Sequence, residues 1–168
     1  MIMFALPALL VVAAVVLGLV YGRSASVTPP ADNDRPLALV PVDAPDAKSE
    51  SCVRLLQALP GELSSGGDVL HRLRLADPAP DGAAAWGRRD QSVVLRCGLP
   101  RPAELTPTSE LIAIDKVGWL VLSEPEMDTF ITADRQVYVA LTVPRGLGTA
   151  PIQTISDKIA TTLPPRTG

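Results

Sequence analysis

The chain has 168 residues, enough for one domain with an additional segment, and its formal net charge is −3. So small a negative charge gives no basic surface field, and no nucleic-acid partner is expected. One histidine and two cysteines are too few for most multi-ligand zinc sites, so neither a metal ion nor another cofactor is expected.

Residues 2–21 form an apolar segment without a charged side chain. A helix of that length spans roughly 30 Å, the thickness of the hydrocarbon core of a bilayer, and Tyr21 and Arg23 suit the interface that follows. The segment therefore predicts a transmembrane signal anchor over residues 1–22, through which the protein would contact the membrane. A cleaved secretory signal is the alternative, because the small residues 24–26 resemble a cleavage site.

Almost the whole protein follows this segment. We therefore expect a single-pass cell-membrane protein with its domain on the extracytoplasmic side, or a secreted protein if the signal is cleaved. Residues 23–35 are rich in proline and small polar residues and predict an extended tether. "DND" at residues 32–34 resembles the start of a calcium loop, but it lacks the glycine and glutamate that complete that motif. Residues 36–164 are assigned to the domain, with a first edge strand at residues 36–42.

A helical pattern begins at Ser49, whose side chain can cap the first turn. Apolar side chains then recur at spacings that share one helical face, until Pro60 and Gly61 break or turn the helix. That face contains Cys52, Leu55, Leu56, Leu59 and Leu63. Cys52 is therefore expected to be buried.

Residues 69–76 predict a strand with two distinct sides. His71 is the sole histidine, and its apolar neighbours on the strand favour a packed or edge position over a catalytic one. Residues 77–87 combine prolines, glycines and aspartates and predict a turn-rich loop. The side of the strand that contains His71 also contains Val69, Leu73 and Leu75.

The segment "SVVLRCGLP", residues 92–100, predicts a buried strand that ends at a glycine and a proline. Alternation places Cys97 on the same side as Val93 and Leu95, so it also faces a core. Cys52 and Cys97 would then meet where the helix packs on the sheet, and in an oxidising compartment they would form a disulfide. Two free buried thiols in a cytosolic protein are the alternative. A redox pair is disfavoured because no CxxC motif is present.

The rest of the domain is rich in strands. Residues 117–123 predict one strand, and residues 128–133 and 137–143 predict a hairpin. Residues 150–163 predict a closing amphipathic helix. Its apolar stripe contains Ile152, Ile155, Ile159 and Leu163. This order predicts an α+β fold, in which an antiparallel or mixed sheet is covered by two helices and preceded by the transmembrane helix.

Several segments of the chain together match a known pattern. They are the apolar N-terminal segment, the proline-rich tether, "CVRLLQALPGEL" (52–63), "WG" (86–87), "VVLRCGLPRP" (93–102), "GW" (118–119), "FITADRQVYVALTVP" (130–144) and the closing helix. Over residues 36–164 the chain resembles the actinobacterial family of domain of unknown function 3515 (DUF3515). The resemblance implies a membrane-anchored or secreted envelope protein, and it implies no activity.

The sequence contains no nucleophile elbow, no HExxH motif and no glycine-rich phosphate loop, and no catalytic residue is assigned. Glu124, Glu126 and Asp128 lie close together before the predicted hairpin, but acidic loops are usually solvated. The aromatic content of 4% also argues against a glycosidase cleft. A binding protein is therefore favoured over an enzyme.

Trp86 lies beside Arg88 and Arg89, and an aromatic ring next to basic groups is typical of an anchor for a partner protein or an anionic ligand. These three residues are the candidate partner-binding residues. Alternatively, Trp86 and Trp119 both cap the core of the sheet. If either tryptophan is exposed, Trp86 is the expected one.

The sequence thus predicts a membrane-anchored cell-envelope protein with a disulfide-stabilised extracytoplasmic domain in a non-catalytic binding or accessory role. Its partner would be another envelope protein or a cell-wall component. The alternative is a small-molecule-handling protein or hydrolase of the envelope that uses the acidic loop or His71.

Overall fold

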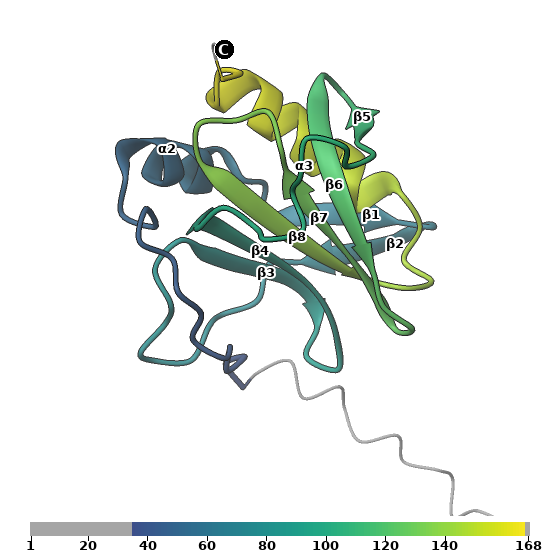
Figure 1. The fold of residues 1–168 in the computed structure, drawn as a ribbon. Coiled ribbons are helices and arrows are strands. Elements are labelled where there is room, and N and C mark those ends of the chain that lie inside the picture. Colours follow the sequence, from purple (N-terminus) through teal and green to yellow (C-terminus); the bar gives the residue numbers. More distant parts are fainter. Residues whose placement is uncertain (1–34, 167–168) are drawn as a thin grey trace, which may run out of the picture. The chain divides into compact units, whose positions relative to one another are not determined.

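The structure is a computed structural model that describes residues 35–166 (Figure 1). The anchor expected over residues 1–22, and the tether up to residue 34, lie outside the described residues. Within residues 35–166, no helix has the length and apolar character needed to cross a membrane.

Two antiparallel sheets and two helices make up the described part of the chain, which confirms an α+β fold. The main sheet has the strand order β3-β4-β8-β7-β6-β5, and a separate hairpin joins β1 to β2. Among residues 35–166, parallel pairing is limited to an isolated bridge between Leu37 and Leu75. The elements are α2 (Glu50–Ala58), β1 (Glu62–Ser65), β2 (Asp68–His71), β3 (Ala83–Arg88), β4 (Gln91–Leu99), β5 (Ile112–Ile114), β6 (Val117–Ser123), β7 (Met127–Thr132), β8 (Tyr138–Pro144) and α3 (Ala150–Thr162).

Helix α2 begins where the sequence predicts. Ser49 is its N-cap, and the backbone N–H of Cys52 donates to Ser49 Oγ at 3.3 Å. The helix ends at Ala58, because Pro60 has no N–H with which to continue the hydrogen-bond ladder. Leu63, which was expected on the helical face, lies instead in β1 and reaches the same core from there.

The predicted loop at residues 77–87 is wrong in its second half, which forms strand β3. This strand pairs with β4 in a register that places Trp86 opposite Val93. Alanine has a low preference for strands, so the segment "AAAWGR" gives no clear strand pattern by itself. Its pairing with β4 and the burial of Trp86 stabilise the extended conformation.

Two other predicted strands are shorter in the structure. The strand expected at residues 69–76 ends at His71 as β2, and the chain beyond it forms single bridges to neighbouring segments. The strand expected at residues 36–42 is reduced to the bridge at Leu37. Prolines at both ends of that segment remove backbone donors that a continuous ladder would need.

The main hydrophobic core lies between one face of the main sheet, the two helices and the β1–β2 hairpin (Figure 1). Helix α3 buries the predicted stripe against the sheet. Strand β8 is buried on both faces, because Tyr138 and Ala140 join a second cluster with Leu105 of the loop after β4. The largest fully buried side chains include Trp86, Trp119, Leu55, Leu95, Leu141, Ile152, Ile155 and Ile159.

Candidate functional site

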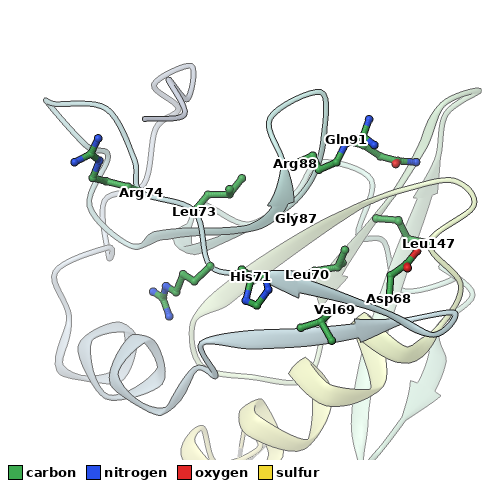
Figure 2. A pocket seen from close by; sticks show the side chains of 11 residues that line it. Asp68, Val69, Leu70, His71, Leu73, Arg74, Gly87, Arg88, Gln91 and Leu147 are labelled. Carbon is green, nitrogen blue, oxygen red and sulfur yellow. The ribbon is translucent and has the colours of Figure 1, made fainter. Parts of the chain in front are cut away.

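A groove with a volume of about 820 Å³ lies between β2 and the end of the β3–β4 hairpin (Figure 2). Residues 68–74 line one side, and Gly87, Arg88 and Gln91 line the other, with Leu147 also contributing. We call this the β2 groove. It contains Arg88, one of the candidate partner-binding residues.

The groove forms because β2 and β3 diverge. The N–H of Arg72 donates to the carbonyl of Gly61, on the side of β1, and the N–H of Leu73 donates to the carbonyl of Ala85 in β3, both at 2.8 Å. The chain therefore leaves β1 and joins β3 at these two residues. An antiparallel bridge joins Arg72 to Trp86 of β3, and the groove lies on the side of this bridge toward Asp68.

Trp86 forms the floor beneath Arg72 rather than an exposed anchor. Its side chain is fully buried, and its indole N–H donates to the carbonyl of Pro60 at 2.9 Å. Trp119 is fully buried as well, so the alternative in which both tryptophans lie in the core of the sheet is confirmed. The guanidinium carbon of Arg72 lies 5.2 Å from the centre of the Trp86 ring, a cation–π contact that fixes the position of the positive charge.

Arg72 carries a positive charge on the wall of the groove. Within residues 35–166, no carboxylate pairs with its guanidinium. Partial burial lowers the pKa of Arg72, because loss of solvent disfavours the charged form. The guanidinium stays protonated and Arg72 as a whole is solvent-exposed, so an anion that entered the groove would meet its full positive charge.

The charge of Arg88 is balanced within its own turn. Its Nε and Nη2 atoms donate to the two carboxylate oxygens of Asp90 at 3.1 and 2.6 Å. The hydrogen bond from Arg88 lowers the pKa of Asp90, and the same pairing raises the pKa of Arg88. Arg89 lies between them in the exposed turn. The partner-binding role of Arg88 and Arg89 stays a prediction.

His71 is exposed at the end of β2 in the two-stranded sheet, so of the two expected positions the edge position is confirmed and the packed one is wrong. The buried side of β2 is that of Leu70, and His71 lies on the other side, where its Nδ1 atom is 2.9 Å from Oε1 of Glu62 in β1. The register pairs these two residues directly. Among the described residues no hydroxyl or thiol is hydrogen-bonded to the ring, so a nucleophile that His71 would activate is not in place.

Glu124 and Glu126 lie in the turn between β6 and β7, Asp128 lies at the start of β7, and Arg145 holds this turn in place. Its Nη2 atom lies 3.2 Å from Oδ1 of Asp128, and its Nε donates to the carbonyl of Glu124 at 3.0 Å. The N–H of Arg145 also donates to the carbonyl of Glu126. These contacts give the acidic loop a structural role. No cluster of three side chains suited to a metal ion occurs in the described residues.

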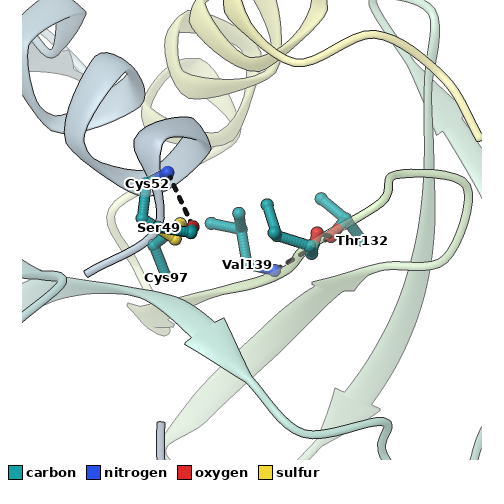
Figure 3. Close-up of a disulfide and its surroundings, with 6 residues drawn as sticks. Ser49, Cys52, Cys97, Thr132 and Val139 are labelled. Carbon is teal, nitrogen blue, oxygen red and sulfur yellow. Dashed lines mark hydrogen bonds between the residues drawn. A yellow bond between two sulfur atoms is a disulfide. The ribbon is translucent and has the colours of Figure 1, made fainter. Parts of the chain in front are cut away.

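Cys52 of α2 and Cys97 of β4 form the predicted disulfide (Figure 3). Their Cα atoms are 5.6 Å apart, and both side chains are fully buried. Cys97 lies opposite Val139 of β8, whose N–H donates to Oγ1 of Thr132 at 2.9 Å. The disulfide therefore fastens α2 to β4, the strand next to the β3 edge of the main sheet.

Gly98 allows the chain that enters α2 to cross the end of β4 beside this disulfide. Its carbonyl accepts a hydrogen bond from the N–H of Asp46 at 3.1 Å. Its φ is +87°, and a Cβ atom at this position would collide with the backbone of Asp46 and Ala47. The glycine that follows Cys97 is thus required both by its backbone conformation and by this close approach.

Sequence reasoning did not single out Arg72. The alternation of β2 places Arg72 on the side of the buried Leu70, and a cation on the core side of a strand is unusual. The alternation therefore marks Arg72 as an unusual residue in the sequence. Its contact with Trp86 could not be predicted, because it depends on residues 83–88 forming a strand.

A family model described as "Protein of unknown function (DUF3515)" matches residues 5–167 of the chain. No curated protein and no solved structure matches the chain.

Proposed function

The chain belongs to the family of proteins of unknown function DUF3515, and for this member we propose a non-catalytic binding role at the cell envelope. The apolar segment of residues 2–21 anchors the protein in the membrane. The domain lies on the extracytoplasmic side and binds, in the β2 groove, a partner that carries carboxylates. An envelope protein and a cell-wall component would both offer this chemistry.

The observation that carries the proposal is the position of Arg72. The side chain is held over the Trp86 ring, lines the groove and has no carboxylate partner in the described residues. A carboxylate is the planar group that a guanidinium binds through two parallel hydrogen bonds. Such a bond would balance the charge of Arg72.

The disulfide supports the proposed location. Cys52 and Cys97 are paired, and disulfides persist in oxidising compartments but are rare in the cytosol. An apolar segment long enough to cross a bilayer precedes the domain in the sequence. Together these features favour a domain that folds after export.

Two contacts disfavour the hydrolase alternative. The acidic loop is held by Arg145, and His71 pairs with Glu62 without a hydroxyl or thiol beside it in the described residues. A catalytic site would need such groups to converge on one point. The positive charge of Arg72 in the groove suits binding instead.

Binding can be tested with the full chain in detergent micelles and two probes, polygalacturonate and poly-L-glutamate. We expect at least one probe to bind, and Arg72→Gln to weaken that binding by about tenfold to a hundredfold, because it removes a charge-assisted hydrogen bond. Arg101→Ala, outside the groove and exposed, is the matched control and should leave the affinity unchanged. Equal binding by the wild type and Arg72→Gln would refute the proposal.

The location can be tested in cells. Acid quenching, alkylation of free thiols and digestion without reductant should yield the cross-linked peptide that contains Cys52 and Cys97. Recovery of both cysteines as alkylated peptides from cells would argue against an extracytoplasmic domain.

A further inference from the structure

An exposed apolar strip lies near the start of the domain. Residues 38–42, "ALVPV", follow the bridge at Leu37 and form no regular secondary structure. All of them are exposed except Leu39, which is half-buried, and Val40 is 77% and Val42 47% exposed. A run of consecutive exposed apolar residues is rarely retained without a function. We call residues 38–42 the apolar strip.

The apolar strip continues into a second groove, which is lined by prolines. This groove has a volume of about 430 Å³ and lies between residues 41–48 and residues 78–81, the second segment beginning with "PAP". An ion pair between Lys48 Nζ and Asp81 Oδ2, at 3.2 Å, joins the two segments. The strip and the groove thus form one apolar surface with polar groups beside it, which is typical of a site that contacts a membrane or another protein.

The place of the strip in the chain favours the membrane as its partner. Residues 23–37 connect the apolar segment to the strip, and even fully extended they span at most about 50 Å. An anchor in the bilayer would therefore hold the strip close to the bilayer surface. Because such a connection gives the strip a high effective concentration there, a weak apolar contact is enough to dock it.

The charges around the strip balance one another. Arg35 precedes it, and Asp43 and Asp46 follow it. Arg96 reaches the strip from β4, where its Nη2 atom donates to the carbonyl of Val40 at 2.7 Å. Since these residues give no excess of positive charge, contact with a bilayer would depend on apolar burial and would not require anionic lipids.

We propose that the apolar strip docks on the surface of the bilayer that holds the anchor. This inference rests on the proposed function, because it requires the membrane anchor of residues 2–21. Val40 and Val42 enter the headgroup region, and the contact fixes the orientation of the domain. Arg96, which bonds to the strip, lies on the face of β4 opposite to Cys97. That face of the main sheet would therefore be turned toward the membrane, and the face covered by α3 would be turned away from it.

The test uses the full chain in phosphatidylcholine vesicles, with a small fluorophore on one introduced cysteine. Cys52 and Cys97 are paired and buried, so only the new cysteine reacts with the fluorophore. Lipids that carry nitroxide groups quench a fluorophore that lies among them. We expect the label at Val40→Cys to be quenched several-fold more strongly than the same label at Gln153→Cys. Gln153 is the matched control, because it is exposed on α3 and belongs to the same anchored domain.

A second substitution tests the apolar contact. Val42→Asp, added to the labelled Val40→Cys protein, places a charge in the strip and should lower the quenching to the level of the Gln153→Cys label. Both valines are exposed, so the fold should be retained.

Three outcomes would overturn the inference. Equal quenching at positions 40 and 153, in a protein that resists alkaline extraction from the vesicles, would overturn the docking and leave the proposed function standing. Release of the protein by alkaline extraction would overturn the anchor, and the inference with it. Shielding of the label at position 40 only at high protein density would show that a second copy covers the strip instead of the bilayer.

Discussion

The indole N–H of Trp119 donates to Oγ of Ser156 at 3.0 Å, and both side chains are fully buried. The bond joins β6 to α3 through the middle of the apolar interface. It explains why a serine occupies the buried side of a helix that is otherwise packed with isoleucine. The ring of Phe130 contacts the same indole edge-on, with the ring centres 6.3 Å apart.

Ser156→Ala should destabilise the domain by about 1–3 kcal/mol, because it leaves a buried N–H without a partner. Urea unfolding followed by tryptophan fluorescence would measure this change. Gln153→Ala, on the exposed side of α3, is the control and should change stability little. The effect of Ser156→Ala should shrink in a Trp119→Phe background, and an unchanged effect there would show that the hydrogen bond is not its cause.

Reduction of the Cys52–Cys97 disulfide should lower the free energy of unfolding by about 4 kcal/mol. The estimate follows from the entropy that the closed loop removes from the unfolded chain, for a sequence separation of 45. Urea unfolding with and without a phosphine reductant would measure it. The variant with Cys52→Ala and Cys97→Ala together should be insensitive to reductant. A wild-type midpoint that does not move on verified reduction would contradict the prediction.

Gly98→Ala should destabilise the domain more than Gly146→Ala. Both glycines have a φ near +90°, namely +87° and +91°, so alanine is strained at either site by roughly 1–2 kcal/mol. At Gly98 the added methyl group also meets the backbone of Asp46 and Ala47, whereas nothing lies within 4 Å at Gly146. Thermal unfolding of the two variants measures how much stability the contact with Asp46 and Ala47 costs. An equal loss of stability in both variants would show that the segment before α2 moves to make room for the methyl group.

Asp90→Asn should strengthen binding of carboxylate probes several-fold, because it releases the charge of Arg88 into the groove. The hydrogen bond from Arg88 holds the pKa of Asp90 below its ordinary 3.8. The ion pair is therefore intact above that pH and is lost only as the pH falls through the lowered pKa. Titration of the wild type and the variant at neutral pH, at two salt concentrations, would measure the effect. An unchanged affinity would exclude Arg88 from the contact.

The elements that the sequence predicts well have a strong local pattern. Helix α2 has a serine cap, α3 has a spaced isoleucine stripe, and the pair β7 and β8 alternates around a short turn. The pairing of Cys97 with Cys52 was predicted because both side chains were expected to be buried, one on a helix and the other on a strand. In each case local pattern and tertiary burial agree.

The elements that the sequence does not reveal depend on distant contacts. Strand β3 is alanine-rich and becomes extended only through β4, and β1 is a short segment whose Leu63 fits a helical period equally well. The groove depends on both of these strands. Arg88 was predicted as a binding residue because it lies close to Trp86 in the sequence. Arg72 was not, because its contact with Trp86 exists only in the folded chain.

The disulfide also determines how the domain would transmit a mechanical load. A force applied between the two ends of the domain would be carried from Cys52 to Cys97 by the disulfide bond. The segment between the two cysteines would therefore not be stretched. That segment would otherwise contribute roughly 150 Å of extension. It contains every lining residue of the β2 groove except Leu147. Tension on the chain would therefore bypass nearly all of the groove.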